Sequence, residues 1–222
     1  MKRLSPPGLA VVLMFLSVAA LVAADSGFVP DESLNIGAVK HQGSVNFDGT
    51  VHRINGSGAE VFGTEDSFFF TFKGMTGDAS ITAHFTEGLQ FVDPWAKAGV
   101  MIRASREADA PNVFFAVTSL NGLVLQNRDA AGAATNMRPF PGQFSTAAGG
   151  KGLWLRLVRQ GNTITAFRSE DGQAWEEAGS FSSVQLDDEA LFGIGMSTHD
   201  ENQQFGFSSF ENVSIVEGVP AS

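Results

Sequence analysis

The stretch WAKAGVMIR, residues 95–103, alternates in character from Lys97 onward. Successive side chains of a β-strand point to opposite faces of its sheet, so an alternation of this kind predicts a strand. One face of the predicted strand carries Ala98, Val100 and Ile102, and the other carries Lys97, Met101 and Arg103. The stretch therefore predicts a sheet whose apolar face is in a core, with Met101 and Arg103 on the opposite face.

The same two-residue period continues on both sides of this stretch. Further strands are predicted at residues 67–73, 78–85, 113–118, 123–128, 153–159, 163–169, 191–197 and 205–215. No segment after residue 24 keeps the apolar spacing of a helix for three turns. Because this many strands must bury their apolar faces against a second layer, we expect an all-β fold, a two-sheet antiparallel sandwich. The segment 129–152, rich in Ala, Gly and Pro, is the longest predicted loop.

The N-terminus has the layout of an export signal. Lys2 and Arg3 precede an apolar run, residues 9–24, that ends in Val-Ala-Ala. This run is shorter than the ~20 residues of a spanning helix, and its small-residue end is typical of a cleavage site. We therefore expect a signal peptide at 1–24, a lead-in at 25–35, a β-sandwich at 36–217 and a tail at 218–222. The mature protein is expected to be exported, extracellular or periplasmic, with no membrane association after cleavage.

Charge and cysteine content narrow the classes of partner. The chain has 14 basic and 24 acidic side chains, a formal net charge of −10, and no cysteine. Loss of Lys2 and Arg3 with a signal peptide makes the charge more negative. An acidic chain is repelled by phosphate backbones, so nucleic acid is not an expected partner. The absence of cysteine excludes disulfides and thiolate chemistry, and the sequence leaves the oligomeric state open.

No constellation of residues predicts catalysis. Glycoside hydrolysis needs two carboxylates held across the scissile bond, and neighbours on one face of a strand lie at alternate positions. The acidic groups 65–66, 176–177 and 187–189 are runs of adjacent residues in turn-like sequence, and histidines 41, 52, 84 and 199 are scattered. We therefore assign no catalytic residue and no required cofactor. A structural calcium ion is left open, with Asp48, Asp66 and Asp78 as candidate ligands.

The segment SEDGQAW, residues 169–175, resembles the Asp-box turn of sialidases and other β proteins. Its Asp-Gly pair supplies the positive φ angle of a tight turn, and its Ser and Asp side chains are suited to binding backbone amides. We expect a structural hairpin here, with Gly172 at the positive-φ position and Trp175 packed on the returning strand. Trp154, on a strand with Leu155 and Leu157, is expected in the core.

Four pieces of sequence in order resemble one known group of domains. They are residues 56–68, 95–103, 154–162 and 169–175, and together they are similar to concanavalin A-like (lectin/glucanase superfamily) domains of largely unknown function. Relatives in that superfamily include the non-catalytic C-terminal modules of β-xylosidases and a domain named after regulation of enolase. The residues that match the family pattern are Trp95, Gly99, Met101, Arg103, Trp154, Arg156, Asp171, Gly172 and Trp175. The resemblance covers roughly residues 36–216 and implies a jelly-roll sandwich with one concave sheet, but no activity.

Two hypotheses of function follow. The first is a secreted non-catalytic module that binds carbohydrate or another polar ligand on its concave sheet, through Met101, Arg103, Gln126, Arg128 and His199. Strand parity places Met101 and Arg103 away from the core face and puts Gln126 and Arg128 on one face of a neighbouring strand, and arginine is a good donor to sugar hydroxyls and carboxylates. One alternative is that these are solvated surface arginines that make local ion pairs. Another is that Arg103 and Arg128 are buried structural arginines that tie loops together. The second hypothesis, a glycoside hydrolase or lyase of the same superfamily, rests on the fold alone.

Overall fold

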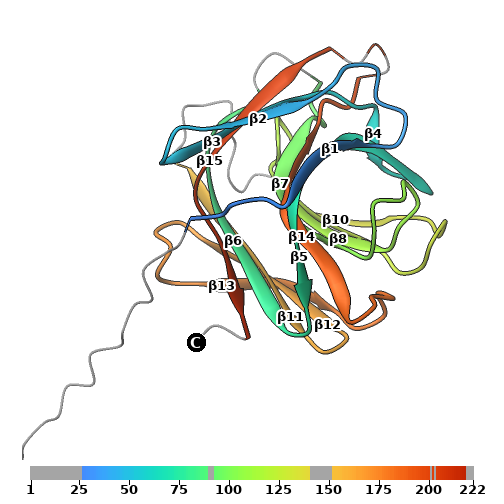
Figure 1. The fold of residues 1–222 in the computed structure, drawn as a ribbon, viewed down its shortest axis with the longest axis vertical. Helices are drawn as coiled ribbons and strands as arrows, with labels where there is room; N and C mark the ends of the chain where they lie inside the picture. Colours follow the sequence, from blue (N-terminus) through green and yellow to red (C-terminus); the bar gives the residue numbers. More distant parts are fainter. Residues whose placement is uncertain (1–26, 90–92, 141–151, 201, 203, 219–222) are drawn as a thin grey trace, which may run out of the picture.

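The computed structural model describes residues 27–89, 93–140, 152–200, 202 and 204–218. The predicted signal peptide lies outside these residues. The described chain forms two antiparallel sheets, traced in Figure 1. None of its residues belongs to a helix long and apolar enough to cross a membrane. The predicted two-sheet antiparallel sandwich is confirmed.

The first sheet, called sheet A, carries the strand predicted from residues 97–103. Its spatial order is β1 (Glu32–Ile36), β5 (Glu65–Thr76), β14 (Glu189–Ser197), β7 (Lys97–Arg103), β8 (Asn112–Thr118), β9 (Leu123–Arg128) and β10 (Asn136–Phe140), and β4 (Glu60–Phe62) pairs with the start of β5. The sequence did not predict three strands of this sheet, β1, β4 and β10. Residues 32–35 of β1 lie in the expected lead-in 25–35, and β10 lies inside the expected loop 129–152. Apolar alternation is weak in both strands because both lie at sheet edges, where only part of each strand is covered.

The second sheet, called sheet B, completes the sandwich. Its spatial order is β13 (Glu176–Phe181), β12 (Thr163–Ser169), β11 (Leu153–Gln160), β6 (Ala79–Gly88), β15 (Gly206–Glu217), β3 (Val51–Gly56) and β2 (Ser44–Phe47). The main core lies between the sheets and includes Ala98, Val100 and Ile102 from β7 together with Leu155 and Leu157 from β11. The predicted inward face of WAKAGVMIR is therefore confirmed.

A second apolar cluster lies on the face of sheet A that points away from sheet B. It contains Ile36, Val61, Phe68, Phe70, Phe72, Met101, Phe114, Ala116 and Val124. The rings of the β5 phenylalanines need space on the neighbouring strand β14, and glycine provides it: a Cβ on Gly195 would come within 2.9 Å of Phe68 Cε2. Val61 of β4 packs in this cluster. The strand β4 therefore lies against the outer face of sheet A. We call residues 60–67, which are β4, the turn and the first part of β5, the covering hairpin.

Candidate functional site

Arg103 and Arg128 are buried, and both bind the covering hairpin. Neither side chain is exposed to solvent. Arg103 donates from Nη1 to Asp66 Oδ2 at 3.0 Å, and Arg128 donates to both carboxylate oxygens of Asp66, at 2.9 and 2.7 Å. Burial lowers the pKa of Arg103 from its ordinary value, and the adjacent Asp66 opposes that shift. The expectation of accessible arginines on a ligand face is wrong, and the alternative of buried structural arginines is the one the geometry supports.

The remaining guanidinium donors of these arginines bind the loops around Asp66. Arg103 donates to the carbonyl oxygens of Ser105 and Glu107, and Arg128 donates to the hydroxyl of Thr135. A buried charge needs this saturation with partners, since an unpaired one costs several kcal/mol. The two arginines therefore hold the loop between β7 and β8 and the loop between β9 and β10 against one carboxylate.

Gln126 and Met101 also face the covering hairpin and are fully buried. Gln126 donates from Nε2 to the carbonyl oxygen of Val61 at 2.9 Å. Met101 packs in the apolar cluster with Val61 and Phe114. Strand parity correctly placed these side chains on the outer face of sheet A, but the chain's own hairpin occupies that face, so none of the four is accessible to a ligand in this structure.

His199, the fifth predicted ligand residue, follows β14 and is partly exposed. It has a positive φ of 52°. Its Nε2 lies 2.5 Å from Glu60 Oε2, and its Nδ1 lies 2.8 Å from Asp93 Oδ1. Glu60 also contacts the buried ammonium of Lys97 at 2.5 Å. The histidine thus joins one end of the covering hairpin to the loop before β7, and it is not grouped with the two arginines.

The carboxylates named as calcium candidates are already engaged by donors. Asp66 holds the two arginines, and Asp48 accepts from Arg53 and from the amide of Val51. Asp78 accepts from the amide of Gly161 at 2.6 Å. In the part of the chain that the structure describes, no group of three or more His, Asp or Glu side chains is placed to hold a metal ion.

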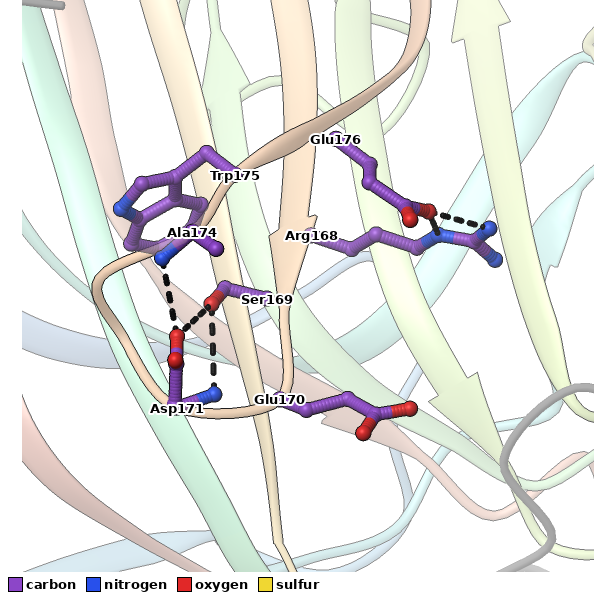
Figure 2. Close-up of a pocket in the computed structure, with 7 residues that line it drawn as sticks. All are labelled: Arg168, Ser169, Glu170, Asp171, Ala174, Trp175 and Glu176. Atoms are coloured by element: carbon purple, nitrogen blue, oxygen red, sulfur yellow. Dashed lines mark hydrogen bonds and ion pairs between the residues drawn. The ribbon is translucent and has the colours of Figure 1, made fainter.

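A pocket of about 320 Å³ lies at the turn between β12 and β13, and it contains the segment singled out as an Asp-box turn. We call it the turn pocket; it is lined by Arg168, Ser169, Glu170, Asp171, Ala174, Trp175 and Glu176. Figure 2 shows Trp175 on one side of the turn and the paired Arg168 and Glu176 on the other. Arg168 donates from Nη2 to Glu176 Oε2 at 2.8 Å. The pocket residues therefore include an indole on one side of the turn and an ion-paired guanidinium and carboxylate on the other. A tryptophan ring is a group that packs against the ring face of a sugar.

The backbone of the turn is held by the bonds expected of this motif. Ser169 Oγ accepts from the amide of Gly172 at 2.9 Å, and Asp171 Oδ1 accepts from the amides of Gln173 and Ala174 at 2.8 and 2.9 Å. The amides of Ala174 and Gln173 hold the pKa of Asp171 below its ordinary value. Gly172 has a φ of +74°, as predicted. A pocket wall fixed in this way keeps its shape before a ligand arrives.

Aromatic and cationic groups continue from the turn pocket onto the outer face of sheet B. The Arg156 guanidinium lies 3.7 Å from the centre of the Trp175 ring. Trp154 lies on the same face under Gly172 and stacks on His84, with ring centres 4.7 Å apart and planes inclined by 13°. The expectation that Trp154 is in the core is therefore wrong: Leu155 points to the core, and its neighbour Trp154 is half-buried on the outside.

Sequence reasoning did not place Trp154 and Arg156 together on this outer face, although a signal for it was present. Trp154 and Arg156 alternate with Leu155 and Leu157, so strand parity puts the tryptophan and the arginine on one outward face. A tryptophan among leucines was instead assigned to a strand buried on both sides.

Comparisons with known proteins identify the fold. A functionally unknown protein from Saccharomyces cerevisiae aligns with a TM-score of 0.63 and 14% identity, over 85% of this chain and 97% of that chain. Carbohydrate binding module CBM66 from Bacillus subtilis aligns with a TM-score of 0.50 and 11% identity, over 82% and 94% of the two chains. Xylan β-1,4-xylosidase from Bacillus halodurans C-125 aligns with a TM-score of 0.54 and 16% identity, over 75% of this chain and 33% of that chain. No family model and no curated protein matches the sequence.

The chain is a concanavalin A-like jelly-roll sandwich, as its sequence resemblance implied. The likeness to these structures, at 11–16% identity, shows the fold alone.

Proposed function

We propose that this chain is an exported, non-catalytic module that binds carbohydrate at the turn pocket. The observation that carries the proposal is the half-buried indole of Trp175 in the lining of that pocket, with the Arg156 guanidinium 3.7 Å from its ring centre; the paired Arg168 and Glu176 lie on the other side of the turn. A tryptophan ring packs against the apolar face of a sugar, and charged side chains exchange hydrogen bonds with its hydroxyls. The volume of about 320 Å³ is at the lower end of ligand pockets, which suits a short stretch of a glycan.

The site lies at the edge of sheet B and not on the face of sheet A. Binding on sheet A through Arg103, Arg128 and Gln126 would need the covering hairpin to leave, and these residues hold that hairpin with buried hydrogen bonds. The turn pocket needs no such rearrangement. The solved carbohydrate binding module of similar fold agrees with a role of this kind, and the export signal predicted at residues 1–24 would bring the protein to extracellular glycans.

Retention on immobilised polysaccharides tests the proposal. The protein is run through gels that contain neutral plant and bacterial polysaccharides, and reducing sugar released from the same polysaccharides is measured in parallel. We expect retardation without release. Trp175→Ala should lose at least about tenfold in affinity, which corresponds to removal of one stacked aromatic contact.

Phe62→Ala is the matched control, because Phe62 is an exposed aromatic, 39% accessible, on the covering hairpin outside sheet A. Its retention should equal that of the parent protein. Equal retention of Trp175→Ala and the parent, with both folded, would contradict the turn pocket as the site. Release of reducing sugar would contradict the non-catalytic role.

A further inference from the structure

The outer face of sheet B presents a level row of side chains that begins at the turn pocket. Register pairs Ser169 of β12 with Trp154 of β11, Trp154 with His84 of β6, and His84 with Glu211 of β15. Neighbouring strands lie about 4.8 Å apart, so the row from Ser169 to Glu211 is about 14 Å long. Ser169 also lines the turn pocket, so the row and the pocket are continuous. We call the row from Trp154 to Glu211 the sheet B strip.

The strip is open to solvent at its β6 and β15 end, while Gly172 lies over Trp154 at the other end. The side chains of His84 and Glu211 are 21% and 37% accessible, and their nearest charged atoms are 3.9 Å apart, too far for a close hydrogen bond. Burial lowers the pKa of His84, which favours the neutral ring at pH 7. A neutral imidazole offers one donor, one acceptor and flat apolar faces. Such a ring beside a tryptophan is suited to a sugar unit.

Arg156 lies beside the strip with donors to spare. Its Nε donates to Thr82 Oγ1 at 2.9 Å, and its guanidinium covers the Trp175 ring. Among the residues that the structure describes, no carboxylate lies within ion-pair distance of this arginine, and no acceptor is bound to its two terminal nitrogens. A half-buried guanidinium with unused donors next to two tryptophans favours a ligand rich in oxygen acceptors.

The charge of this region distinguishes neutral from acidic glycans as ligands. The turn pocket and the strip contain Glu170, Asp171, Glu176 and Glu211 against Arg168 and Arg156, and the whole chain has a formal net charge of −10. Acidic polysaccharides would therefore be repelled, whereas neutral glycans would meet both donors and acceptors.

We propose that the sheet B strip is a second subsite continuous with the turn pocket, and that the ligand is a neutral polysaccharide chain lying across β12, β11, β6 and β15. This inference rests on the proposed carbohydrate-binding function and adds the polymer length and the charge class. A single sugar unit would fill the turn pocket only, and a longer chain would reach His84 and Glu211 as well.

Calorimetry with xylo-, cello- and malto-oligosaccharides of two to six units tests the proposal, with oligogalacturonates as acidic probes. In the series that the parent protein binds best, affinity should rise by about tenfold or more from the dimer to the hexamer. His84→Ala and Glu211→Gln should each remove much of that rise while leaving dimer affinity within about twofold. Arg53→Ala, a change at an exposed ion pair on β3, is the matched control and should leave the whole series unaltered.

The outcomes separate this inference from the proposed function. Equal affinity for dimer and hexamer, or hexamer affinity unchanged in both strip variants, would overturn the strip while Trp175→Ala still reports on the turn pocket. Tighter binding of oligogalacturonates than of every neutral series would overturn the charge class. Absence of binding to all four series, together with no retention on polysaccharide gels, would overturn the proposed function itself. Because His84 stacks on Trp154, Glu211→Gln serves as the second test if His84→Ala fails to fold.

Discussion

The guanidinium of Arg128 donates a hydrogen bond from each terminal nitrogen to the carboxylate of Asp66, and neither side chain is exposed to solvent. The partners are 62 residues apart in sequence, so this contact joins the start of β5 to the end of β9. Asp66 also accepts from Arg103 and Asn112, which makes it the centre of a buried polar network on the outer face of sheet A.

The first prediction concerns that network. Arg128→Met keeps the aliphatic stem but removes the charge, and it leaves Asp66 with one arginine and one amide. Loss of one partner from a buried ion pair costs about 3–5 kcal/mol, so the free energy of unfolding in urea should fall by that amount. Arg53→Met is the control, since the Arg53–Asp48 pair is 49% and 40% exposed and should contribute less than about 1 kcal/mol. Similar losses for the two variants would contradict the structural role of Arg128.

The second prediction concerns Gly172, which has a φ of +74° and lies against Trp154. A Cβ there would come 2.8 Å from Trp154 Cε2. Backbone strain and this overlap should together lower the free energy of unfolding of Gly172→Val by about 1–3 kcal/mol. Gly161→Ala isolates the backbone part, because Gly161 has a φ of +56° and no atom within 4 Å of an added Cβ. Thermal unfolding of both variants checks the difference. A melting temperature of Gly172→Val equal to that of the parent would refute the turn geometry.

The third prediction is a dependence of stability on pH. Burial lowers the pKa of His52 and of His84 below the ordinary histidine value of 6.5. The unfolded chain therefore takes up protons at these sites before the folded chain does, and stability that is fully present above pH 6.5 is lost as the pH falls toward the folded pKa values. Urea unfolding between pH 7.5 and the onset of carboxylate titration near about pH 4 measures this slope. The double variant His52→Gln/His84→Gln should show a shallower slope of unfolding free energy against pH. An unchanged slope would argue against burial of these histidines as its cause.

The fourth prediction concerns export, which the sequence of residues 1–24 indicates. Protein recovered from the native host should begin near Asp25, and N-terminal sequencing of the material outside the cytoplasm checks this. A protein that keeps Lys2 and Arg3 and stays with the membrane fraction would contradict it.

The sequence predicted the fold because the physical signal for a sandwich is local. Side-chain alternation along 97–103, 123–128 and 163–169 was enough to place these strands with the bounds that the structure has. The same parity put Met101 and Arg103 on the outer face of sheet A. A strand's own residues contain that information.

The candidate site was not predicted, because the residues of a strand do not show which distant segment of the chain covers that strand. Parity shows that Arg103 and Arg128 leave the core, but it does not show that Glu60–Ser67 folds over them. Asp66 reaches the arginines from the start of β5, where that strand pairs with β4. The arginines were expected to be exposed and are buried, whereas Trp154 was expected in the core and lies on the outer face. There the turn at Gly172 covers it.

The covering hairpin also bears on how the molecule folds. Asp66 reaches partners at sequence separations of 37, 46 and 62 residues, and the Val61 carbonyl accepts from Gln126, 65 residues away. None of these bonds forms until β7, β8 and β9 have assembled, and closing loops of this length is slow compared with local pairing. We expect the hairpin to dock late in folding. Residues that anchor it would then chiefly slow unfolding, and the Arg128–Asp66 contact would set the lifetime of the native state more than the rate at which it is reached.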